Sequence, residues 1–119
     1  MTRDNLLQQI KERLNEVYGS RLKGIVLYGS EVRNENAEDS DIDLMVLLNG
    51  PVSFGKELRS IIEALYPLQL EVIRPLHAIP VDINVYEAGE FALYRNAKKE
   101  GFFAGGLDNL LSGSEGQEG

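Results

Sequence analysis

Two short apolar runs, at residues 24–28 and 44–48, constrain what this chain can fold into more than any other feature of the sequence. Each run is too short for a helix but has the length of a buried β-strand. A strong turn signal, the sequence NGP at residues 49–51, ends the second run. We therefore expect two strands in the core of the protein, at residues 23–29 and 42–48.

Helices are expected on either side of these strands. The first is predicted over residues 3–18, where apolar residues recur on one helical face. The second is predicted near residues 54–66, ended by Pro67. A third is predicted near residues 88–100, ended by Gly101. The chain is therefore expected to alternate between helices and strands.

The last predicted strand covers residues 81–86, where apolar and polar residues alternate strictly. The structure of residues 68–79 is left open, with a short extra strand at residues 71–73 as one alternative. At 119 residues the chain fits one domain, which we place at residues 1–111. The composition of residues 112–119 predicts a disordered tail.

Composition and charge exclude several kinds of site and partner. There is no cysteine, so a disulfide framework, a thiolate metal site and a cysteine nucleophile are all excluded. The apolar runs are far shorter than a membrane span, and the N-terminal sequence has no signal-peptide core. We therefore expect a cytoplasmic protein without a membrane partner. The formal net charge of −7 disfavours nucleic acid as a partner, because binding to phosphate backbones needs clustered lysine and arginine.

Asp41 and Asp43 stand at the beginning of the second strand, where carboxylates are unusual. Side chains alternate along a strand, so both aspartates point to the same face, roughly 6.5–7 Å apart. A buried carboxylate is strongly unfavourable unless it is paired or binds a metal. The pair therefore predicts a magnesium site, in which both carboxylates converge on one ion or on two neighbouring ions.

A capping box offers another interpretation of the same residues. Ser40 and Asp43 fit the pattern Ser-x-x-Asp before an apolar run, in which Asp43 would only cap a helix. The run at 44–48 is apolar at every position and too short for a helix, which favours the strand.

Asp82 is the third candidate carboxylate. In the predicted strand at 81–86, Val81, Ile83 and Val85 form the face that meets the core, so Asp82 lies on the open face. If the strands share a sheet, Asp82 can lie beside the aspartate pair. The alternative is a solvated residue on a half-exposed strand.

Gly29 and Ser30 follow the first strand, at a position where a helix can begin. Helix N-termini bind phosphate through free N–H groups, and glycine lets the backbone approach a ligand closely. Ser30 adds a hydroxyl donor, and Arg33 is a candidate phosphate contact one turn later. The alternatives are an ordinary turn and a solvated surface arginine.

The pattern GS-x10-DxD at residues 29–43 resembles the signature of the DNA polymerase beta-like nucleotidyltransferases. The similarity is closest to the minimal nucleotidyltransferases, small proteins often found beside HEPN-domain partners. Arg33 stands where many members carry an arginine, and Asp82 matches the family's third strand carboxylate. The resemblance covers roughly residues 22–101.

Two positions depart from the family pattern. Glu31 stands where members often have arginine or another non-acidic residue, and an acid there could weaken phosphate affinity. The segment EGFFAGG at 100–106 differs from the family's EG followed by an aliphatic-tyrosine pair. Neither departure touches the candidate carboxylates.

The resemblance implies an α+β fold, with a small mixed sheet and helices packed on one face. It also implies nucleotidyl transfer from a nucleoside triphosphate to an acceptor. In this mechanism Asp41 and Asp43 hold two Mg²⁺ ions, Asp82 joins one of them and serves the acceptor, and the residues around Gly29 hold the phosphates of ATP. His77, the only histidine, is assigned no role.

A chain of this size leaves little sequence for an acceptor pocket. We therefore expect a partner, either a HEPN-domain protein or a second copy of the chain. Two functions of different class follow. The first is an enzyme, the antitoxin-like half of a HEPN pair, that transfers AMP to a hydroxyl of its partner or of a small molecule. The second is a non-catalytic nucleotide-binding module that masks a HEPN-type partner by contact.

Overall fold

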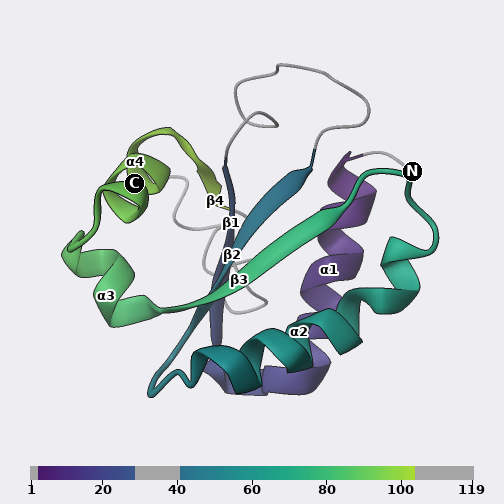
Figure 1. Cartoon of the computed structure of the whole chain (residues 1–119), viewed down its shortest axis with the longest axis horizontal. Helices are drawn as coiled ribbons and strands as arrows, with labels where there is room; N and C mark the ends of the chain where they lie inside the picture. The colour runs from purple at the N-terminus through teal and green to yellow at the C-terminus, as the bar shows by residue number, and fades with distance from the viewer. Residues whose placement is uncertain (1–2, 29–40, 104–119) are drawn as a thin grey trace, which may run out of the picture.

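A mixed β-sheet forms the centre of the protein (Figure 1). The computed structural model describes residues 3–28 and 41–103. Within these residues the sheet has four strands in the order β3-β2-β1-β4, and their bounds are β1 Leu22–Tyr28, β2 Ile42–Leu48, β3 Leu76–Asp82 and β4 Phe102–Phe103. β1 is antiparallel to both of its neighbours, whereas β2 and β3 are parallel. The predicted first two strands and the mixed sheet are confirmed; Gly29, the last residue of the first predicted strand, lies outside the described residues.

Helices cover both faces of the sheet. The helical elements are α1 Arg3–Tyr18, the short 3-10 helix η1 Gly19–Arg21, α2 Phe54–Gln69, α3 Ile83–Ala88 and α4 Ala92–Glu100. α1 and α2 lie on one side and α3 and α4 on the other (Figure 1). We expected all helices on one face of the sheet. This holds for α1 and α2, but α3 and α4 pack on the opposite face.

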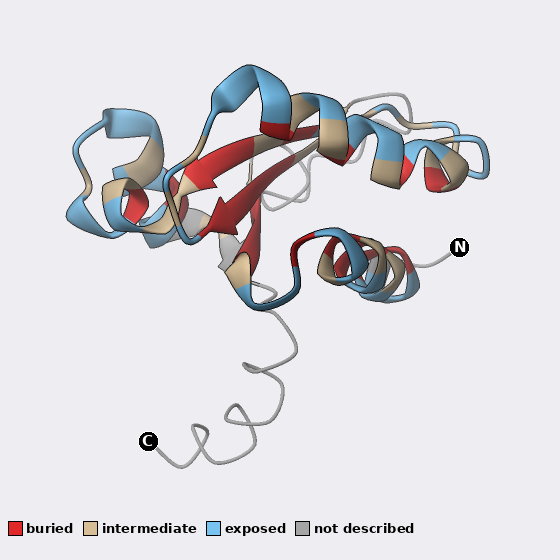
Figure 2. Cartoon of the chain, turned by 90° about the horizontal axis from the view of Figure 1, so that it is seen from below, coloured by how far each residue is buried: buried red, intermediate tan, exposed pale blue. Residues whose placement is uncertain are grey.

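Alternation along β1 and β2 divides the core into two clusters, because successive side chains point to opposite faces. The larger cluster joins α1, α2 and the face of β2 that carries Leu44, Val46 and Leu48. The smaller one joins α3, α4 and the face that carries Met45 and Leu47. All five of these side chains are completely buried, and Figure 2 shows the strands as the most buried layer. Burial of each contributes about 1.5–3 kcal/mol, so β2 is anchored from both sides.

Pro67 lies inside α2 and does not end it, which corrects the predicted bound at residue 66. Proline removes one helical hydrogen bond, but here it stands two residues before the last residue of the helix. Leu68 is 1% exposed and holds the last turn in the core. The amide of Leu70 donates to the carbonyl of Tyr66, which closes that turn. Residues 71–73 form a turn and bend and no strand.

The third strand begins and ends earlier than predicted. β3 covers residues 76–82, and residues 83–88 form α3 in place of a strand. Asp82 is the N-cap of this helix, and its Oδ1 accepts a hydrogen bond of 2.8 Å from the amide of Asn84. Gly89, with φ +66°, ends α3 in the left-handed conformation that glycine adopts readily. The predicted helix at 88–100 therefore begins at Ala92, and it ends before Gly101 as expected.

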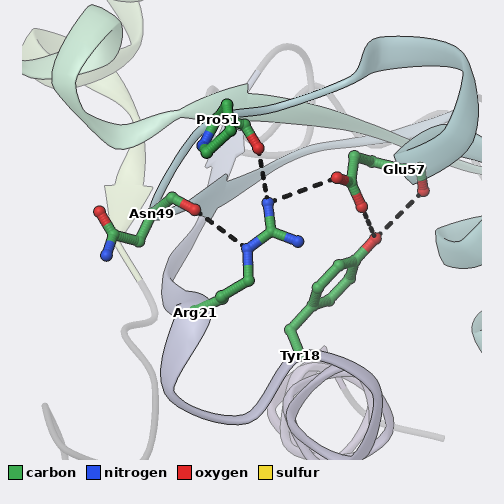
Figure 3. A network of polar contacts seen from close by, with 5 residues as sticks. All are labelled: Tyr18, Arg21, Asn49, Pro51 and Glu57. Carbon is green, nitrogen blue, oxygen red and sulfur yellow. Dashed lines mark hydrogen bonds and ion pairs between the residues drawn. The ribbon is translucent and has the colours of Figure 1, made fainter.

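A polar network at the base of the sheet ties α1, α2 and the end of β2 together (Figure 3). Arg21 donates to the carbonyls of Asn49 at 3.0 Å and Pro51 at 2.9 Å, and its Nη2 lies 3.3 Å from the carboxylate of Glu57. The hydroxyl of Tyr18 donates to Glu57 Oε1 at 3.1 Å and to the Glu57 carbonyl at 3.2 Å. Glu57 is 5% exposed, so its charge needs these partners.

Candidate metal site

Three side chains meet where β2 begins. Asp43 is the second residue of β2, and the strand register places it between Tyr28 of β1 and His77 of β3. Asp41 immediately precedes β2. One ligand atom from each of Asp41, Asp43 and His77 can be chosen so that the three lie within 4.8 Å of one another. We call these three residues the DDH cluster.

The DDH cluster is accessible from solvent. His77 Nδ1 lies 3.2 Å from Asp41 Oδ2, and their side chains are 63% and 42% exposed. Asp43 is half-buried beside them. The cluster therefore presents two carboxylates and an imidazole to solvent where β2 and β3 begin.

The charge in the cluster is incompletely balanced. Burial raises the pKa of the Asp43 carboxyl group, the nearby charge of Asp41 raises it further, and His77 lowers it. A raised carboxyl pKa means that the surroundings disfavour the negative charge. A cation bound between the two carboxylates would remove this penalty.

The geometry fits one divalent metal ion. Metal–ligand distances of about 2.0–2.3 Å place ligands on opposite sides of an ion about 4–4.6 Å apart. The ligand atoms of the DDH cluster lie within 4.8 Å of one another, which is close to this separation. Carboxylate oxygen and imidazole nitrogen are both ordinary metal ligands.

Tyr28 forms one wall of the cluster. It is half-buried, and burial, followed by the charge of Asp43 and by Tyr94, raises the pKa of its hydroxyl group. Tyr28 and Tyr94 both pack against the smaller core cluster. Tyr28 therefore stays a neutral phenol at physiological pH and adds no charge to the site.

Asp82 does not join the aspartate pair, which corrects the expectation that it lies beside them. It pairs with Leu48 at the far end of β2, five positions from Asp43 along the strand, or about 16 Å. Leu48 also faces the opposite side of the sheet from Met45. The reason is the register of β3, in which His77 takes the position beside Asp43. The Asp82 carboxylate caps α3 instead.

The predicted nucleotide-binding residues Gly29, Ser30 and Arg33 lie outside the described residues, so their roles stay predictions. Among the described residues, sequence reasoning missed His77. No local pattern marks it, because a single histidine in an unassigned stretch carries no periodic signal. Only the pairing of β3 with β2 brings it to Asp43.

Comparisons with known proteins agree on one family. Residues 7–103 match the nucleotidyltransferase domain family. The chain is 34% identical over 70 residues to a "putative protein adenylyltransferase" of Methanocaldococcus jannaschii, across 57% of this chain and 69% of that protein. The fold is similar to that of a "putative nucleotidyltransferase" from Sulfolobus solfataricus, with a TM-score of 0.54 and 16% identity over 83% of this chain and 78% of that one. At 16% identity, the similarity to the Sulfolobus solfataricus protein shows the fold alone.

Proposed function

Because the chain belongs to the nucleotidyltransferase domain family, we propose that it is a metal-dependent enzyme that transfers AMP from ATP to a hydroxyl group of a partner protein. The observation that carries this proposal is the DDH cluster, in which Asp41 and Asp43 lie close together at the solvent-accessible beginning of β2. Nucleotidyl transfer depends mainly on positioning and on neutralising phosphate charge. A carboxylate-rich site that holds divalent cations supports such chemistry.

The proposed reaction forms a bond between the acceptor oxygen and the α-phosphorus of ATP and releases pyrophosphate. The hydroxyl proton passes to a carboxylate of the site. A divalent ion, Mg²⁺ or a related cation, would neutralise the triphosphate and lower the pKa of the acceptor hydroxyl. Asp41 and Asp43 would hold it. Gly29 and Ser30 directly follow Tyr28 in the chain, and Tyr28 pairs with Asp43, which supports their proposed role on the phosphates together with Arg33.

A protein acceptor is favoured by the relative whose name describes it as a protein adenylyltransferase. The net charge of −7 disfavours a nucleic-acid acceptor. We propose a HEPN-domain protein as the partner, so that this chain acts as the antitoxin-like half of a pair. A second copy of the chain is the other candidate for the acceptor surface.

One observation supports a second candidate function. Asp82 lies away from the aspartate pair, so the described site has two carboxylates in place of the three that the family resemblance implies. A chain with this site could bind a nucleotide and mask its partner by contact, without transfer.

The experiment that separates the two functions follows a label from ATP to protein. The chain and its co-purifying partner are incubated with a divalent cation and ATP labelled in the α-phosphate. Mass spectrometry of the partner then locates any added AMP. We expect AMP on a hydroxyl side chain of the partner, and Asp43→Asn abolishes the label. Binding of both ATP and partner without any label would support the non-catalytic function.

None of the helices in residues 3–28 and 41–103 has both the length and the apolar character that crossing a bilayer requires.

A further inference from the structure

We propose that His77 supplies a nitrogen ligand to the metal of the DDH cluster, and that this ligand makes the site prefer Mn²⁺ over Mg²⁺. The inference rests on the proposed function only in taking the cluster to be the metal site. It adds a ligand and a metal preference that a site of carboxylates alone would not have.

The strand pairing keeps His77 beside the carboxylates. β2 and β3 are parallel, and His77 is the residue paired with Asp43. Asp43, Met45 and Leu47 pair with His77, Ile79 and Val81, so the contact belongs to a regular strand ladder whose later members, Met45, Leu47 and Val81, are buried. His77 Nδ1 already lies 3.2 Å from Asp41 Oδ2. The backbone therefore holds the imidazole within reach of any ion that the two aspartates bind.

The exposure of His77 suits a ligand better than a structural residue. Its side chain is 63% exposed, and it is absent from both core clusters. An exposed polar contact between histidine and aspartate contributes little to stability. The fold therefore loses little stability when His77 gives up its contact with Asp41 and binds a metal ion instead.

The chemistry of the ligands sets the metal preference. Mg²⁺ favours oxygen ligands in a strict octahedron and keeps several water molecules. Imidazole nitrogen suits transition-metal ions, and affinities rise along the first-row series that begins with Mn²⁺. Two carboxylates with one imidazole therefore form a mixed oxygen and nitrogen site, which should discriminate between Mn²⁺ and Mg²⁺ more strongly than three carboxylates do.

The composition of the chain makes the nitrogen ligand directly observable. His77 is the only histidine, and there is no cysteine. In tag-free protein, an imidazole signal on a bound ion can come from no other side chain. Pulsed electron paramagnetic resonance of bound Mn²⁺ detects a coordinated ¹⁴N nucleus, and this measurement needs neither ATP nor an acceptor.

The test compares the parent chain with His77→Ala and His77→Asp. We expect a ¹⁴N signal on Mn²⁺ in the parent and in neither variant. We also expect the ratio of Mn²⁺ to Mg²⁺ affinity, measured by competition, to fall about tenfold or more in His77→Asp, which keeps three ligands but makes all of them oxygen. Thermal unfolding of the metal-free proteins checks that both variants fold, as the exposure of His77 predicts.

Two results would overturn the inference. One is the absence of a ¹⁴N signal in the parent while Mn²⁺ is bound. The other is a ratio of Mn²⁺ to Mg²⁺ affinity that is the same in His77→Asp as in the parent. Either result leaves the proposed function standing if AMP is still transferred. A nitrogen signal in a chain that never transfers AMP would support the inference and contradict the proposed function.

Discussion

The surroundings of Asp43 disfavour the negative charge of its carboxyl group. Burial and the charge of Asp41 raise the pKa of its carboxyl group above the ordinary value of 3.8. The folded protein therefore favours the neutral acid. The contribution of this group to stability is complete below pH 3.8 and is lost as the pH rises through the raised folded pKa. At pH 7 the residue destabilises the metal-free fold, as expected of a group that serves a ligand.

The first prediction follows from this penalty. Asp43→Asn keeps the shape of the side chain and removes its charge, so we expect the metal-free variant to be as stable as the parent at pH 7 or slightly more stable. Metal binding and AMP transfer should fall by orders of magnitude. Urea unfolding and the labelling assay measure the two effects. A strongly destabilised variant would instead support a structural role for this carboxylate within β2.

Tyr18 shows the same direction of pH dependence, but in the alkaline range. Burial, followed by its hydrogen bond to Glu57, raises the pKa of its hydroxyl group from 10.0 to about 12. The neutral phenol donates to Glu57, whereas the phenolate would repel that carboxylate. The stability that this contact provides is complete below pH 10 and is lost as the pH rises through about 12.

The second prediction uses this loss of stability at alkaline pH. Tyr18→Phe should lower the free energy of unfolding by about 1–3 kcal/mol near neutral pH, because buried Glu57 loses a donor. The gap between parent and variant should shrink as the pH approaches 12. Urea unfolding at several alkaline pH values measures it. Tyr66→Phe is the matched control, since Tyr66 is 58% exposed on α2, and it should show no such gap. A gap that is constant with pH would argue against the Tyr18–Glu57 contact.

At the scale of elements, local patterns predicted much of the fold but not the pairing of β3. α1 and β2 were predicted with their observed bounds, because helical spacing and short apolar runs are local signals. The prediction that Asp41 and Asp43 lie on the same face of the sheet is also local, because it follows from the alternation of side chains along a strand. The positions of His77 and Asp82 depend on the register of β3 against β2, which joins residues more than 30 positions apart. Alternation at 81–86 suited a strand, yet Ile83 and Tyr86 also fit one face of a helix that packs on the core.

The third prediction tests this register. Asp82 caps α3, and asparagine caps a helix about as well as aspartate, whereas alanine costs about 0.5–2 kcal/mol. We therefore expect Asp82→Asn to keep both stability and AMP transfer, and Asp82→Ala to lose stability only. Urea unfolding and transfer assays on both variants provide the measurement. Loss of transfer in a stable Asp82→Asn protein would place Asp82 in the reaction and contradict the described register.

At the scale of the whole molecule, the formal net charge of −7 makes binding of ATP, itself an anion, depend on a cation. The fourth prediction is that ATP with Mg²⁺ or Mn²⁺ raises Tm more than ATP alone. A ligand that binds only the folded state stabilises it by about 2.7 kcal/mol at a hundredfold excess over Kd. Differential scanning fluorimetry compares the conditions, with the cation alone as control. An equal Tm at millimolar ATP with and without cation would remove the argument for a metal site.

The last prediction concerns the acceptor. Residues 3–28 and 41–103 form one sheet with helices on both faces, and we expect a partner to supply the pocket for the second substrate. Transfer requires an acceptor hydroxyl held in line with the α-phosphorus, and such positioning contributes roughly 7–11 kcal/mol to lowering the barrier. We therefore expect purified protein alone to transfer little or no AMP to itself, and transfer to begin when the partner is added.

The assay incubates labelled ATP and a divalent cation with the protein alone, with RNA and with the co-purifying partner. Asp43→Asn, mixed with the same partner, controls for a contaminating transferase. Because the chain is acidic, label should reach the partner protein and not the RNA. Label on RNA would show that local contacts near the DDH cluster override the repulsion of the whole molecule. Equal labelling of the protein with and without partner would show that the chain carries its own acceptor.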